Sequence, residues 1–68
     1  MSKLAVRFRP EVSPQDIEAL EHRHGLAAVG GIPALRIRYY DVPRELTAAL
    51  EAETAVEYVE EEQDLKAS

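Results

Sequence analysis

Three stretches of the chain alternate between apolar side chains and polar or charged ones. These stretches are residues 3–9, 34–40 and 55–60. A period of two predicts strands that each bury one face. Residues 26–29 form a shorter apolar run, and the pair Gly30-Gly31 behind it is typical of a turn, so a further strand is predicted there.

Two other stretches have apolar residues at helical spacing and recognisable helix ends. The first helix is predicted to begin after Ser13 as N-cap, with Pro14 at its first position. Gly25 is expected to end it, because glycine adopts the left-handed conformation of a helix C-terminus without a steric penalty. The second helix is predicted to cover residues 43–53, with an apolar stripe along one side.

The resulting order β-α-β-β-α-β predicts an α+β fold. It is the ferredoxin-like βαββαβ open-faced sandwich, in which a four-stranded antiparallel sheet carries two helices on one face. Residues 1–62 are expected to form this domain, and residues 63–68 a C-terminal tail. The predicted core consists of Leu4, Val6, Phe8, Ile17, Leu20, Leu35, Ile37, Tyr39, Leu46, Leu50, Val56 and Tyr58. The other face of the sheet is expected to be uncovered and to carry Ala5, Arg7, Arg9, Arg36, Arg38, Tyr40, Glu57 and Val59.

Composition argues against several classes of function. The chain has no cysteine, so it forms no disulfide and no cysteine-ligated zinc site. Its net charge is −5, with 13 acidic residues against 8 basic ones, whereas a general nucleic-acid binder needs an excess of Lys and Arg. No apolar run approaches the roughly 20 residues that cross a bilayer. We therefore expect no cofactor, no metal, no nucleic-acid or membrane partner, and a monomer when the chain is free.

The two histidines do not form a predicted site. His22 and His24 are two residues apart on the first helix, so they project in different directions and cannot share a metal ion. His24 lies on the apolar side next to Gly25, where we expect a structural role and a bond to a terminal carbonyl. No combination of Ser, His and an acidic residue suggests nucleophilic catalysis, so the sequence predicts that the chain is not an enzyme.

Acidic residues are concentrated at the end of the last predicted strand. Glu60 and Glu62 are two apart in an extended segment, so their carboxylates are expected on one side, roughly 7 Å apart. Carboxylates placed in this way suit the unpaired amides and the positive dipole at helix N-termini of a partner. The tail that follows has no predicted partner within the fold, and a free extended peptide adds readily to the edge of another protein.

The chain resembles subtilisin propeptides and the free-standing inhibitors related to them, such as the fungal proteinase B inhibitors. The resemblance covers essentially the whole chain. It is carried by residues 6–10, Ser13-Pro14, His24-Gly25, Val42-Pro43 and, most clearly, by residues 56–62, which read Val-Glu-Tyr-Val-Glu-Glu-Glu.

The resemblance implies a function and a set of contact residues. In that family the uncovered sheet face packs on two parallel surface helices of a subtilisin-like serine protease, and the tail enters the substrate cleft as a product does. Glu60 and Glu62 match the acidic residues that cap those two helices. The tail residues expected at subsites S4 to S1 are, in order, Leu65, Lys66, Ala67 and Ser68. The residues expected to touch the protease from the sheet face are Arg36, Arg38, Tyr40 and Val59.

Two other functions stay open from the sequence. One is an excised subtilase prodomain that acts as an intramolecular chaperone, which would be secreted, whereas a free-standing inhibitor would be cytoplasmic. The other, from a different class, is a ferredoxin-like regulatory or RNA-binding module. RNA-reading sheets stack bases on aromatic side chains, and Tyr40 is the only aromatic residue expected on the uncovered face, so the sequence favours the inhibitor.

Overall fold

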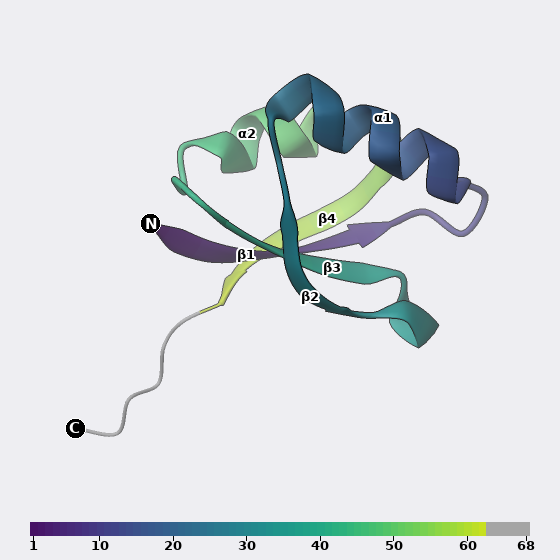
Figure 1. The fold of residues 1–68 in the computed structure, drawn as a ribbon, viewed down its shortest axis with the longest axis horizontal. Coiled ribbons are helices and arrows are strands. Elements are labelled where there is room, and N and C mark those ends of the chain that lie inside the picture. The colour runs from purple at the N-terminus through teal and green to yellow at the C-terminus, as the bar shows by residue number, and fades with distance from the viewer. Residues whose placement is uncertain (63–68) are drawn as a thin grey trace.

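The computed structural model describes residues 1–62, and these form the predicted ferredoxin-like sandwich. The elements are β1 (Ser2–Phe8), α1 (Pro14–His24), β2 (Ala28–Ile32), the 3-10 helix η1 (Pro33–Leu35), β3 (Ile37–Val42), α2 (Leu46–Glu51) and β4 (Val56–Glu62). The strands form one sheet in the order β2-β3-β1-β4, with antiparallel neighbours throughout. Both helices lie on the same face of the sheet (Figure 1), as predicted. Within the described residues, neither helix has the length and apolar character needed to cross a membrane.

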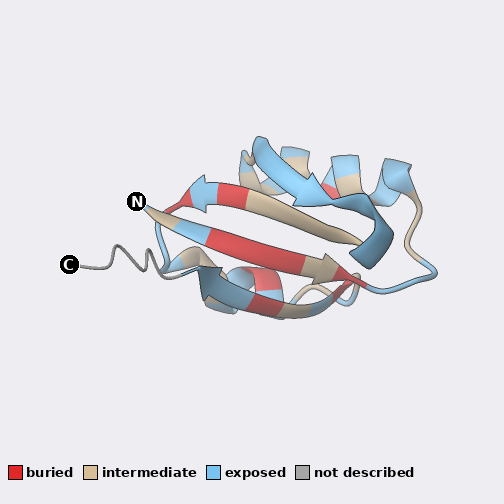
Figure 2. Ribbon diagram, turned by 90° about the horizontal axis from the view of Figure 1, so that it is seen from below, coloured by how far each residue is buried: buried red, intermediate tan, exposed pale blue. Residues whose placement is uncertain are grey.

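The core lies between the helices and the two central strands. Leu4, Val6 and Phe8 of β1 are almost completely buried, and Leu20 of α1 and Leu50 of α2 pack against them. Figure 2 shows that burial is greatest along β1, which has a neighbour on each side. β1 is therefore the central strand of the domain, in contact with β3, β4 and the core.

The ends of α1 are formed as the sequence predicts. The Ser13 Oγ accepts a hydrogen bond of 3.1 Å from the backbone N–H of Asp16, which satisfies one of the free amides of the first turn. Gly25 ends the helix with φ at 65°, in the left-handed region, and the Leu26 N–H donates back to the Glu21 carbonyl at 2.8 Å.

The connection between β2 and β3 differs from the predicted glycine turn. Both glycines belong to β2, and the chain reverses through η1, after which Arg36 takes a left-handed conformation with φ at 59°. A Cβ at Gly31 would lie 2.7 Å from the Ile37 carbonyl oxygen, so glycine is needed because the two backbones approach closely there. The glycine pair therefore lies within β2, where Gly31 allows close contact with β3, and does not form the turn of this hairpin.

The second helix is shorter than residues 43–53. Pro43 and Arg44 form a turn, in which their carbonyls accept from the Leu46 and Thr47 N–H groups, and α2 begins only at Leu46. Glu45 stands at the N-cap and makes no side-chain hydrogen bond to the helix, so α2 begins without a side-chain cap.

The face assignment predicted for β3 is wrong. Tyr40 pairs with Leu4 and Arg38 pairs with Val6, and directly opposed residues point to the same face, so both lie on the helix-covered side. Tyr40 is 0% exposed. Its hydroxyl donates to the Glu21 Oε2 of α1 at 2.7 Å, and Arg38 Nη1 donates to the same oxygen at 2.9 Å. Burial, together with this acceptor, raises the pKa of the Tyr40 hydroxyl far above its ordinary value.

The residues predicted to fill the core from this strand lie elsewhere. Leu35 belongs to η1 and is 44% exposed, while Ile37 and Tyr39 fall on the face away from the helices. The register with β1 places Tyr40 and Val42 in the core under the helices, and Glu21 satisfies the polar groups of Tyr40 and Arg38 that this arrangement brings in.

A bulge in β4 overturns a second assignment. Val59 pairs with Val6 and Tyr58 with Arg7, but Phe8 pairs with Val56, so Glu57 is an extra residue in the strand. Val56 and Val59 therefore both face the core, whereas strict alternation had placed Val59 on the uncovered face and Tyr58 in the core.

Candidate functional site

The face of the sheet away from the helices, called the open face from here on, is the candidate site. Figure 2 looks onto it, with the helices behind the strands. The register of the strands places on it Lys3, Ala5 and Arg7 of β1, Ile37, Tyr39 and Asp41 of β3, and Tyr58, Glu60 and Glu62 of β4. Of the uncovered residues predicted from the sequence, Ala5 and Arg7 are confirmed by this register.

The centre of the open face is apolar and partly aromatic. Ala5 lies directly opposite Tyr39, and Arg7 directly opposite Tyr58, so a small residue sits next to two large rings. The Lys3 Nζ is 5.0 Å from the centre of the Tyr39 ring, and the Arg7 Cζ is 5.9 Å from that of Tyr58. Each cation is within the range of a cation–π interaction, which helps to hold the rings in place on the surface.

The two carboxylates singled out from the sequence share this face. Glu60 lies opposite Ala5 and Glu62 opposite Lys3, and both are exposed. Among the contacts of residues 1–62, neither side chain takes part in an ion pair or a hydrogen bond. The predicted placement of the two groups on one side is therefore confirmed, and their oxygens are accessible to a partner.

Of the four residues expected to touch a partner from the sheet, three are not on the open face. Arg38, Tyr40 and Val59 lie on the helix-covered side, for the reasons given above. Arg36 follows η1, where its Nε donates to the Phe8 carbonyl at 3.1 Å and its Nη2 is 4.0 Å from a Glu57 oxygen. Those bonds hold Arg36 at one end of the sheet.

Sequence reasoning missed the aromatic residues of this face. Tyr40 was expected to be its only aromatic, whereas Tyr39 and Tyr58 are there instead. For Tyr39 a signal existed, because Asp41 and Val42 continue the alternation and assign Val42, and with it Tyr40, to the core. For Tyr58 the bulge at Glu57 leaves no comparable signal.

The tail residues 65–68, with Leu65, Lys66, Ala67 and Ser68, lie outside the described residues. The last described residue, Glu62, belongs to β4 and is one of the two carboxylates of the open face.

No protein-family model, curated protein or solved structure matches the chain. The open face and the resemblance in sequence therefore carry the functional proposal. Within residues 1–62, no group of three or more His, Asp or Glu side chains is placed to hold a metal ion.

A separate cluster joins the end of α1 to the turn after α2. The Glu53 Oε2 is 2.8 Å from the His24 Nε2, and its Oε1 accepts from the Arg23 Nη2 at 2.7 Å. His24 thus bonds a side chain, where the sequence had suggested a carbonyl. The hydrogen bond with His24 is the main cause that lowers the pKa of Glu53 below its ordinary value of 4.5; partial burial opposes this, and Arg23 adds to the lowering.

Replacing Glu53 by Gln is expected to lower the free energy of unfolding near neutral pH and to have little effect in acid. Because the folded-state pKa lies below the unfolded value of about 4.5, the stabilisation is fully present above that pH. It is lost as the pH falls through the folded-state pKa. Urea unfolding of both proteins at pH 6 and pH 3 measures the difference, with Glu51→Gln on α2 as the control. An equal loss at both pH values would contradict this role.

Proposed function

We propose that the chain inhibits subtilisin-type serine proteases, with the open face bound to the protease surface and the tail in the substrate cleft. The observation that supports this most directly is the position of Glu60 and Glu62. Both carboxylates are exposed on the open face at the end of β4, immediately before the tail.

The two carboxylates fit a pair of adjacent helix N-termini. Alternate residues of a strand are about 7 Å apart, and the axes of packed helices are about 8–10 Å apart, a difference that flexible glutamate side chains span. The first amides of a helix have no intrahelical acceptor, and a carboxylate there also faces the positive end of the dipole. The resemblance in sequence implies that two parallel helices of the protease would pack against this face.

The centre of the open face suits close contact with those helices. Ala5 projects little, and its larger neighbours leave only 7% of it exposed, so they supply most of the surface that a helix would meet there. Tyr39 and Tyr58 flank it, and tyrosine is among the residues that contribute most to binding when buried in an interface.

The size of the chain is compatible with an inhibitor interface. Protease–inhibitor contacts bury about 800 Å² on each partner. That is about one sixth of the 4719 Å² of accessible surface of the chain. One sheet face together with a short tail is enough to supply such an area.

The tail is proposed to lie in the cleft as an extended strand, with Leu65 to Ser68 in subsites S4 to S1. Main-chain hydrogen bonds to the cleft edges would hold it, and the alternate residues Leu65 and Ala67 would face pockets. An excised prodomain would use the same face and tail, and it is distinguished by a second activity, acceleration of protease refolding.

The direct test is inhibition of a panel of subtilisin-type proteases by the purified chain, alongside a gel-shift assay with single-stranded RNA. We expect inhibition of at least one protease and no shift of RNA. Binding of RNA without inhibition of any protease would overturn the proposal in favour of a nucleic-acid module.

The double change Glu60→Gln and Glu62→Gln is expected to raise the inhibition constant roughly 3- to 30-fold. Each contact with a helix N-terminus is worth about 0.3–1 kcal/mol, and about 1.4 kcal/mol corresponds to a factor of ten. The matched control is Glu45→Gln with Glu51→Gln, which changes the net charge equally at exposed positions near α2. Equal effects from both pairs would show that only the net charge matters.

A further inference from the structure

One stretch of the surface has no polar side chain at all. Charged residues make up 31% of the chain, yet residues 26–35 read Leu-Ala-Ala-Val-Gly-Gly-Ile-Pro-Ala-Leu. From residue 27 to residue 35 every position is exposed. Consecutive exposed apolar residues of this number are unusual on a monomer and mark an interaction surface.

The centre of this stretch is an unprotected sheet edge. β2 pairs with β3 on one side only, so its outer backbone N–H and C=O groups have no sheet partner within the described residues. The opposite edge strand, β4, carries charges that discourage pairing with another chain, namely Glu57, Glu60, Glu61 and Glu62. β2 has no such charge, and Val29, at a bulge in its pairing with β3, is 60% exposed.

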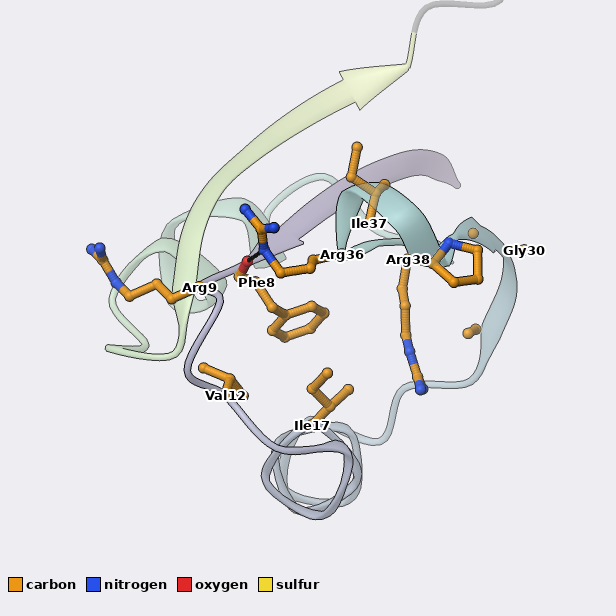
Figure 3. Close-up of a pocket in the computed structure, with 11 residues that line it drawn as sticks. Phe8, Arg9, Val12, Ile17, Gly30, Arg36, Ile37 and Arg38 are labelled. Carbon is orange, nitrogen blue, oxygen red and sulfur yellow. Dashed lines mark hydrogen bonds between the residues drawn. The ribbon is translucent and has the colours of Figure 1, made fainter.

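The apolar surface continues from β2 into a pocket of about 470 Å³ on the helix-covered side. Figure 3 shows Phe8, Val12 and Ile17 pointing into this pocket from one side, with Gly30 at its other border. Ala28, Gly30 and Gly31 line the border with little or no side chain, so the pocket stays open next to the edge.

We propose that β2 pairs with β2 of a second copy of this chain, antiparallel and about a two-fold axis, so that the two sheets become one. A two-fold interface needs a patch that is complementary to itself. Antiparallel pairing of β2 with itself opposes uncharged residues throughout, so no like charges meet although each chain has a net charge of −5.

The charge distribution favours pairing of β2 with β2 of a second copy over pairing of β2 with β4. The acidic strand β4 is at the far edge of the sheet, so pairing through β2 keeps the acidic edges of the two copies at opposite ends. Pairing of β2 with β4 of another copy would instead bring the four glutamates of β4 next to an apolar edge. Each copy would then still have one free edge, so further copies could add without limit. Under this proposal the chain associates at high concentration, whereas a monomer was expected from the sequence.

This inference does not rest on the proposed inhibition. The edge of β2 is distinct from the open face of β1, β3 and β4, so a paired chain keeps Glu60, Glu62 and the tyrosines accessible. A variant that fails to pair is expected to inhibit as well as the original chain, which separates the two proposals experimentally.

Sedimentation velocity of the full chain from about 10 μM to about 1 mM tests the pairing. The weight-average mass is expected to rise from 7.6 kDa towards twice that value. Ala28→Lys places a lysine on the helix-covered side of β2, where an inward charge discourages strand addition. It is expected to raise the midpoint concentration of association at least tenfold. The matched control, Ala49→Lys on α2, makes the same substitution at an exposed alanine and is expected to change nothing.

Amide exchange of the unmodified chain gives a second readout that needs no variant. Protection of residues 28–32 is expected to increase with protein concentration, while that of β4 stays constant. A chain that is monomeric at about 1 mM, or association weakened equally by both lysine variants, would overturn the proposal. Protection of β2 that appears only after a protease is added would also overturn it, because the protease would then be the occupant.

Discussion

Deleting residues 65–68 is expected to abolish inhibition of a responsive subtilisin-type protease, with at least a 100-fold rise in the inhibition constant. Inhibition requires an occupied cleft, and under our proposal Leu65, Lys66, Ala67 and Ser68 are the residues that occupy it. Burial of one leucine-sized side chain alone contributes about 1.5–3 kcal/mol, and the main-chain hydrogen bonds of the strand are lost as well. The measurement is the inhibition constant of the truncated and the complete chain.

The fold of the truncated chain provides the control. No core residue of the described domain lies beyond Val59, so the circular dichroism spectrum and the thermal midpoint are expected to stay unchanged. The open face remains, so calorimetry with the protease should still detect weaker binding. Inhibition by the truncated chain that equals that of the complete chain would refute the cleft-occupying mechanism.

Replacing Phe8 by Ala is expected to leave the free domain mostly unfolded. Phe8 is 1% exposed in the central strand, and loss of a buried phenylalanine costs about 3–5 kcal/mol. A single hydrophobic core in a domain of this length rarely supplies more than about 3–5 kcal/mol of stability, so the substitution removes most or all of it. Phe8→Leu keeps most of the volume and is expected to cost less than about 1.5 kcal/mol. Urea unfolding followed by circular dichroism measures both variants.

Catalytically inactive protease is expected to restore the fold of the Phe8→Ala variant. A partner that binds only the folded state stabilises it by about 2.7 kcal/mol at a hundred times its dissociation constant. Phe8 lies on the helix-covered side, so a weaker apparent affinity of this variant would reflect the folded fraction and not a lost contact. A Phe8→Ala domain with an unchanged thermal midpoint would show that the core does not depend on this residue.

The local signals in the sequence predicted the elements and their order well, because they depend on neighbouring residues only. Ser13 and Gly25 act on the chain within one turn of their own position, and the structure confirms both caps. The alternation of residues 3–9 likewise determines which side of β1 is buried, and Leu4, Val6 and Phe8 are in the core.

The faces of β3 and β4 depended on contacts that are distant in sequence. Arg38 lies on the helix-covered side, where Glu21 of α1 accepts its hydrogen bond. Periodicity gave no sign of that partner. The extra residue Glu57 reverses the alternation within β4, and a bulge has no reliable signature in a single sequence. The candidate site was therefore predicted where it depends on spacing within one strand, as for Glu60 and Glu62, and missed where it depends on register.

The order of the strands has a consequence for synthesis of the chain. β1 is made first, but its neighbours β3 and β4 are made later, and β4 ends only at Glu62. At about 5–20 residues per second, roughly 3–10 s pass between the completion of β1 and that of β4. Throughout this interval the most buried strand of the sheet lacks the partner on one of its edges. The four-stranded sheet therefore cannot form strand by strand in the order of synthesis. It is complete only when β4 has been made and can pair with β1.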